Sequence, residues 1–196
     1  MENTIEYNGY TIKIIQDEFA DSPDSWGNDD IFIVYDHRQF CVERKGFDPT
    51  EIWEHLQTRK TYKDYWVFPV YAYIHSGVAL SLGKTSYPFN TGWDTSMKGF
   101  ALVSRQYGKA NAIKYAEGLI DTWNTYLKGD VWGYQIEKDG EDLDSCWNYY
   151  GQDHCIEDAK GMVDCYVKDA FTKRVAQLKT FIRNHVPFEV RQQAFA

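Results

Sequence analysis

The stretch TIEYNGYTIKII, residues 4–15, predicts a β-hairpin. Asn8-Gly9 separates two short runs that are rich in β-branched and aromatic residues. Both central residues of a tight type I′ turn need a positive φ angle, which Asn and Gly adopt readily. Strands joined by so short a turn pair antiparallel, so the chain is expected to begin with an antiparallel sheet.

Outward from this hairpin, further segments with strand or helix periodicity favour an α+β fold. Strands are predicted at 31–35, 40–43, 66–74, 78–82, 99–104, 131–137 and 143–149. Helices are predicted from Pro49, after the N-cap Asp48, and at 109–128 and about 153–185. We therefore expect a single α+β domain over 1–196, with two or three helices, including the long C-terminal one, packed on a mainly antiparallel sheet.

Composition places the chain among globular proteins. It has 196 residues, of which 17% are aromatic, and disordered chains lack so many large rings. The opening MENTIEYNGY does not resemble a signal peptide, and no apolar run is long enough to span a membrane. Four Cys without a CxxC pair suggest free thiols in a reducing compartment, so we expect a cytoplasmic protein.

Charge is unevenly distributed along the chain, whose formal net charge is −8. Residues 17–30 hold six acids and no Lys or Arg, and residues 137–158 hold eight acids and one Lys. These segments are either solvated loops or an acidic face that docks on a basic partner. Direct nucleic-acid binding needs a concentrated basic patch, and only residues 173–183 are basic, so the charge disfavours it.

The segment 75–100 is the best candidate for a pocket, together with 143–149. His75 follows a very apolar run, where it acts as a base or ligand or is tied to loop carbonyls. Asp94 either caps a turn or orients His75. Asp144 is a further carboxylate candidate, on the same strand face as Cys146. One His and one Asp do not make a metal site, so no metal and no cofactor is expected.

Common catalytic signatures are missing from the sequence. It contains no P-loop, no GxGxxG, no GxSxG, no HExxH and no paired-carboxylate signature. This absence weighs against common hydrolase, kinase and dehydrogenase chemistry, and we do not expect an ordinary enzyme.

Several segments together carry a resemblance to a known family. They are DSPDSWGNDD, DHR, YIHSG, SYPFNTGWDTSMKGF, YLKGDVWGYQIE and DSCWNYYG, in this order over residues 21–151. In this order they resemble a family of uncharacterised accessory proteins of bacteriophages and other mobile elements. The family pattern differs at residues 26–28, 86–89 and 93–96, and it does not include the C-terminal helix. The resemblance implies a bacterial host cell as the setting, and no mechanism.

Two functional hypotheses follow. The first is a protein that counteracts a host defence system by binding a host protein, such as a nucleic-acid-binding defence component, through an acidic surface with aromatic anchors. Its candidate binding residues are Trp26, Asp29, Asp30, His37, Arg38, Phe89, Trp93 and Trp147. The alternative is an enzyme or a binder of a small molecule such as a nucleotide, with a pocket around residues 75–100 and 143–149 in which His75 and Asp94 are the polar groups.

Overall fold

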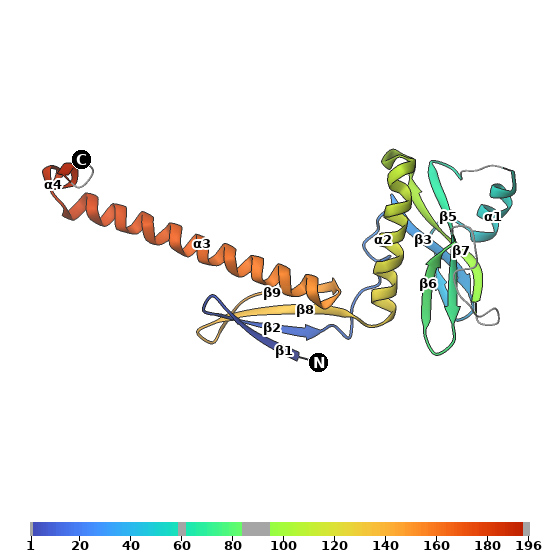
Figure 1. Ribbon diagram of the computed structural model, residues 1–196, viewed down its shortest axis with the longest axis horizontal. Helices are drawn as coiled ribbons and strands as arrows, with labels where there is room; N and C mark the ends of the chain where they lie inside the picture. Colours follow the sequence, from blue (N-terminus) through green and yellow to red (C-terminus); the bar gives the residue numbers. More distant parts are fainter. Residues whose placement is uncertain (1, 59–61, 84–94, 194–196) are drawn as a thin grey trace. The chain divides into compact units, whose positions relative to one another are not determined.

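The computed structural model describes residues 2–58, 62–83 and 95–193 (Figure 1). The chain forms two compact units: unit 1 comprises residues 1–16 and 132–196, and unit 2 comprises residues 17–131. Each unit contains an antiparallel sheet with helices, so the predicted α+β class is confirmed. The expectation that residues 1–196 behave as a single domain stays a prediction.

Unit 1 contains a four-stranded sheet. Its strands are β1 (Glu2–Tyr7), β2 (Tyr10–Gln16), β8 (Val131–Lys138) and β9 (Glu141–Tyr150), in the order β1-β2-β8-β9. The predicted first hairpin is confirmed, with φ angles of 51° at Asn8 and 79° at Gly9. Asp139 and Gly140 join β8 to β9 with φ angles of 54° and 84°, as a two-residue turn requires.

The long C-terminal helix α3 (Gln152–His185) packs on this sheet with its first half. Apolar residues alternate along β2, so one face of the sheet is buried against the helix. The core between them contains Tyr10, Ile12, Ile14, Trp132, Tyr134, Ile136, Cys155, Ala159 and Val163. The helix continues unbroken through Gly161. A short helix, α4 (Phe188–Gln193), follows it.

Unit 2 contains a five-stranded antiparallel sheet in the order β4-β3-β7-β5-β6. The strands are β3 (Ile31–His37), β4 (Phe40–Val42), β5 (Tyr65–Ile74), β6 (Val78–Leu82) and β7 (Thr95–Ser104). The β5–β7 register shifts between Val70 and Tyr71, directly after Pro69. Proline lacks the N–H group that a ladder hydrogen bond needs, so it is tolerated within a sheet beside such irregularities.

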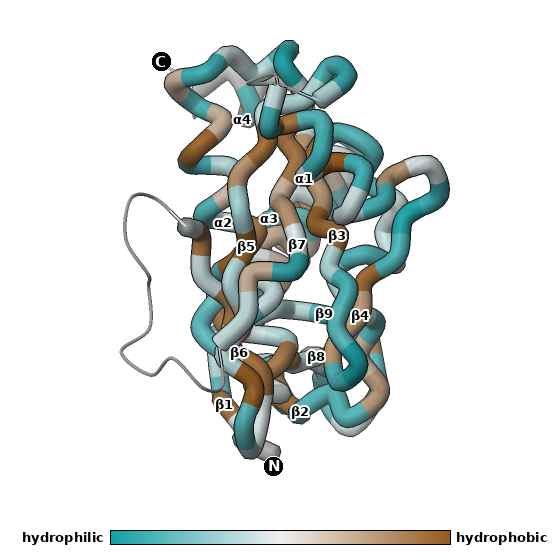
Figure 2. Tube along the Cα trace, turned by 90° about the vertical axis from the view of Figure 1, so that its right-hand side faces the viewer, coloured by the Kyte–Doolittle hydropathy of each residue, from teal (hydrophilic) through white to brown (hydrophobic). Residues whose placement is uncertain are grey.

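Helices cover both faces of this sheet. Helix α2 (Lys109–Leu127) packs on the face that carries Tyr35, and α1 (Pro49–Thr58) packs on the face that carries Phe100. Strands buried on both faces need apolar side chains at every position, which explains the runs IFIV and FALV. Figure 2 shows these runs as hydrophobic stretches beside the labels β3 and β7.

The predicted start of α1 is confirmed in detail. The carboxylate Oδ1 of Asp48 accepts hydrogen bonds from the N–H groups of Thr50 (2.7 Å) and Glu51 (3.1 Å). The bonds from Glu51 and then Thr50 lower the pKa of Asp48, because they stabilise its ionised form. The cap fixes the residue at which α1 begins. Asp48, Pro49 and Glu51 at this start also line a hollow in the surface of unit 2.

Candidate functional site

The acidic loop, residues 17–30, leads into β3 of unit 2. Its C-terminal end is tied by two tyrosine hydroxyl groups, one on β5 and one on the short 3-10 turn (Arg105–Tyr107) that follows β7. Tyr65 donates to the carbonyl oxygen of Asp29 (2.9 Å), and Tyr107 donates to the carboxylate of Asp30 (3.2 Å). The loop is therefore anchored to its neighbours despite its irregular backbone.

Arg44, directly after β4, joins two acids of this loop. Its Nη1 lies 3.3 Å from the carboxylate of Asp24, and its Nη2 pairs with the carboxylate of Asp29. The guanidinium group also lies over the ring of Phe32, 4.2 Å from the ring centre. The side chain is only 14% exposed, so this arginine connects the loop to the core of unit 2.

Two aromatic side chains of the acidic loop face solvent. Phe19 is 94% exposed and Trp26 is 58% exposed. The N–H of Phe19 donates to the carboxylate of Asp17 (3.1 Å), which holds the backbone at the phenylalanine. Exposed aromatic groups within a polar surrounding are typical of protein-binding surfaces.

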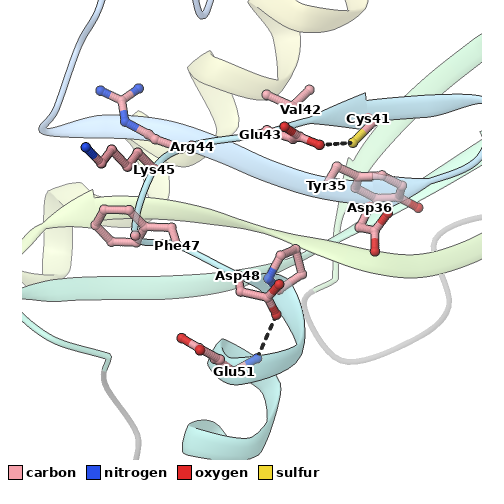
Figure 3. A pocket seen from close by; sticks show the side chains of 12 residues that line it. Tyr35, Asp36, Cys41, Val42, Glu43, Arg44, Lys45, Phe47, Asp48 and Glu51 are labelled. Carbon is pink, nitrogen blue, oxygen red and sulfur yellow. Dashed lines mark hydrogen bonds between the residues drawn. The ribbon is translucent and has the colours of Figure 1, made fainter.

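A hollow of about 640 Å³ lies beside the acidic loop, between β3, β4 and the start of α1 (Figure 3). We call it the acidic groove. Its lining consists of Tyr35, Asp36, Cys41, Val42, Glu43, Arg44, Lys45, Gly46, Phe47, Asp48, Pro49 and Glu51. Four acids face two basic residues there, and Arg44 belongs to both the groove and the loop contacts. The groove therefore extends the acidic surface of unit 2 and favours cationic groups of a partner.

A smaller and more apolar hollow of about 260 Å³ adjoins the groove. It is lined by Asp36, Pro49, Thr50, Trp53, Met97, Lys98 and Phe100. Trp53, on α1, is itself exposed. An apolar recess beside an acidic one suits a partner that presents a basic side chain next to an apolar one.

Cys41, within the groove, has a raised pKa. Partial desolvation of the thiol is the first cause, and the carboxylates of Glu43 and Asp36 add to it. Its Sγ donates to Glu43 Oε1 over 3.9 Å. We expect Glu43→Gln to lower this pKa and to speed alkylation of Cys41 by iodoacetamide about two- to threefold near pH 8, because more thiolate forms.

The rate is measured by peptide mass mapping, which separates Cys41 from the other cysteines. Glu51→Gln is the matched control, because Glu51 lines the same groove but does not contribute to the pKa of Cys41. Equal acceleration by both variants would show that the Glu43 contact has no specific effect.

Within unit 2, the described binding residues predicted from the sequence lie near the two ends of β3. Trp26, Asp29 and Asp30 belong to the acidic loop, before β3 begins. His37 is the last residue of β3 and Arg38 follows it, about 20 Å away along a strand of this length. The Nδ1 atom of His37 accepts a hydrogen bond from the N–H of Gln39 (3.2 Å), which is a role within the turn.

His75 lies in the exposed turn between β5 and β6. Its N–H donates to the carbonyl oxygen of Gly77 (3.1 Å), and its ring stacks beside Tyr73 at 6.5 Å between centres. Its proposed companions Phe89, Trp93 and Asp94 lie outside the described residues. The pocket around 75–100 therefore stays a prediction.

Asp144 and Trp147 belong to β9 of unit 1. The Asp144 carboxylate accepts a hydrogen bond from the Tyr166 hydroxyl of α3 (3.1 Å). The ring of Trp147 lies over Gly133 of the neighbouring strand β8. Both residues thus make contacts within unit 1. The candidacy of Asp144 as a catalytic residue and of Trp147 as a binding residue stays a prediction.

Ionisable groups next to β9 are held in their protonated forms. Burial, and secondly the charge of Asp144, raises the pKa of Tyr134 to about 12. Burial also raises the pKa of the Cys155 thiol to about 12. A thiol with so high a pKa is not a nucleophile at neutral pH, so this cluster contributes packing and hydrogen bonds.

Sequence reasoning missed Arg44, Glu43 and Trp53 as site residues. The apolar spacing of Ile52, Trp53 and Leu56 is typical of a packed helix face and gives no sign of a site. Glu43-Arg44-Lys45 is a short mixed-charge run of the kind found on many surfaces. Nothing in the local pattern connects it with the acids of the loop.

Within residues 2–58, 62–83 and 95–193, no three His, Cys, Asp or Glu side chains are grouped as metal ligands would be. The helices of this part of the chain include none with the length and apolar character needed to cross a membrane. The chain matches no family model, no curated protein and no solved structure. The proposal below therefore depends on the surface of unit 2.

Proposed function

We propose that the chain is an accessory protein of a bacteriophage or mobile element that counteracts a host defence system by binding a host protein. One observation carries the binding proposal. The acidic loop displays Phe19 and Trp26 among six carboxylates, in a conformation held by Arg44.

The physical chemistry of such a surface favours a basic partner. Large aromatic side chains contribute much of the binding free energy at protein interfaces. Surrounding charges of one sign speed the encounter with a partner of the opposite sign and reject like-charged surfaces. Because the acidic groove adjoins the loop, a host surface that normally holds nucleic acid is a suitable counterpart. The order of the motifs from DSPDSWGNDD to DSCWNYYG supports the phage setting.

Affinity capture of the tagged chain from host lysate tests the proposal. We expect one stoichiometric host protein that is retained at about 0.15 M salt and lost at about 0.5 M salt, because salt screens exposed charges. Glu18→Lys with Phe19→Ala is expected to abolish capture. Both side chains are exposed, so the melting temperature should not change.

Glu141→Lys with Leu143→Ala is the matched control, since it makes the same change of charge and also removes an exposed apolar side chain in the other acidic segment. Capture that survives the loop variant but not the control would move the interface to unit 1. Capture that survives both variants and high salt would contradict an acidic interface.

A further inference from the structure

The second half of α3 makes few contacts with the rest of unit 1. Packing on the sheet ends near Tyr166, whose ring stacks on Tyr10 at 6.2 Å. Beyond it lies the helical arm, residues 167–185, which runs past the end of the sheet β1-β2-β8-β9 (Figure 1). Every residue of the arm is exposed except the half-buried Val175.

The helical arm nevertheless carries an apolar stripe. Val167, Phe171, Val175, Leu178 and Ile182 recur at intervals of three or four residues, so they share one face over about 22 Å of helix. Phe171 is 69% exposed and Leu178 is 51% exposed. Isolated helices of this length are marginally stable in water, and tertiary packing normally supplies their stability. The stripe therefore needs a covering surface.

We propose that a second copy of this chain covers the stripe, with the two helical arms paired antiparallel. The spacing of the stripe fits a two-fold axis. Val167, Phe171, Leu178 and Ile182 are separated by 4, 7 and 4 residues, an arrangement symmetric about the midpoint between residues 174 and 175. Antiparallel pairing about that midpoint sets Val167 against Ile182 and Phe171 against Leu178, so one patch meets its own copy.

Charge on α3 selects the same direction. The half that packs on the sheet and the first residues of the arm hold five acids and two lysines: Asp153, Glu157, Asp158, Lys160, Asp164, Lys168 and Asp169. The rest of the arm holds only basic charges: Lys173, Arg174, Lys179 and Arg183. Antiparallel pairing about that midpoint brings Lys179 and Arg183 of one arm within a helical turn of Asp169 and Asp164 of the other, whereas parallel pairing sets basic against basic.

Light scattering coupled to size-exclusion chromatography of the full chain tests the pairing. We expect a dimer, and we expect Phe171→Glu with Leu178→Glu to raise its dissociation constant at least about 100-fold, because four charges would be buried. Thr172→Glu with Thr180→Glu is the matched control: it adds the same charge to the same helix but off the stripe. A monomeric wild-type chain, or equal loss of dimer in both variants, overturns the proposal.

Cross-linking tests the direction. The exposed Cys41, Cys146 and Cys165 are first replaced by Ser. Val167→Cys alone and Ile182→Cys alone should then form no intermolecular disulfide, while a mixture of the two should. Self-linking of either variant would indicate a parallel pair. A wild-type chain that is monomeric but binds vesicles containing phosphatidylserine would assign the basic arm to a membrane surface instead.

Discussion

Alanine in place of Gly99 is expected to lower the free energy of unfolding of unit 2 by about 3 kcal/mol. Gly99 lies in β7, opposite Tyr35 of β3 and Val70 of β5. A Cβ atom there would collide with the carbonyl oxygen of Val34 and with the Tyr35 ring, whose Cγ would lie 2.8 Å away. The ring cannot yield, because Tyr35 is completely buried and its hydroxyl donates to the carbonyl oxygen of Ser96 (2.7 Å).

Gly118→Ala is the matched control for this substitution. Gly118 lies in α2, and a Cβ atom there meets no atom of the described residues within 4 Å. Alanine should therefore stabilise the helix by about 1 kcal/mol. Urea denaturation with amide exchange of β3 and β7 peptides measures both effects within unit 2. A Gly99→Ala variant as stable as the wild type would contradict the close approach of these two strands.

The features that the sequence predicted well are local. The Asn8-Gly9 hairpin and the start of α1 at Asp48 depend on a few neighbouring residues. The types of these residues favour the φ angles and the capping hydrogen bond that the structure contains. The long α3 was predicted from its periodicity for the same reason. Such elements need no knowledge of distant parts of the chain.

The division of the chain into two units could not be predicted from local sequence patterns. Strand β2 pairs with β8, so that Thr11 lies opposite Glu137, and the whole of unit 2 is inserted between them. Both hairpins of unit 1 satisfy their local turn rules whichever sheet they join. Long-range packing of apolar faces decides which sheet each hairpin joins, and the periodicity of the sequence does not predict that packing.

The candidate site was predictable to a similar extent. Composition identified the acidic loop and its exposed Trp26, because both are properties of one segment. Arg44 was missed because its partners Asp24 and Asp29 lie 20 and 15 residues earlier in the sequence. The groove was missed because it forms only when β4 and the start of α1 come together.

Gly133→Ala is expected to destabilise unit 1 by about 2 kcal/mol and to become favourable when Trp147 is also replaced by alanine. A Cβ atom on Gly133 would enter the Trp147 indole ring on the neighbouring strand. The ring would have to leave its place, and its packing would be lost. Without the indole there is no collision, and alanine is then favoured over glycine in a strand by about 0.5 kcal/mol.

A double-mutant cycle in urea measures this change of sign, with the amide exchange of β8 as the readout for unit 1. Leu143→Ala, another exposed apolar residue of β9, is the control background, in which Gly133→Ala should remain unfavourable. Whether Gly133→Ala changes from destabilising to stabilising when Trp147 is removed shows how firmly the indole is held. A true reversal means that the indole is held over Gly133, so a partner meets it as a rigid surface. A Gly133→Ala substitution without effect in the wild-type background would mean that the ring moves away freely, as an adaptable binding anchor would.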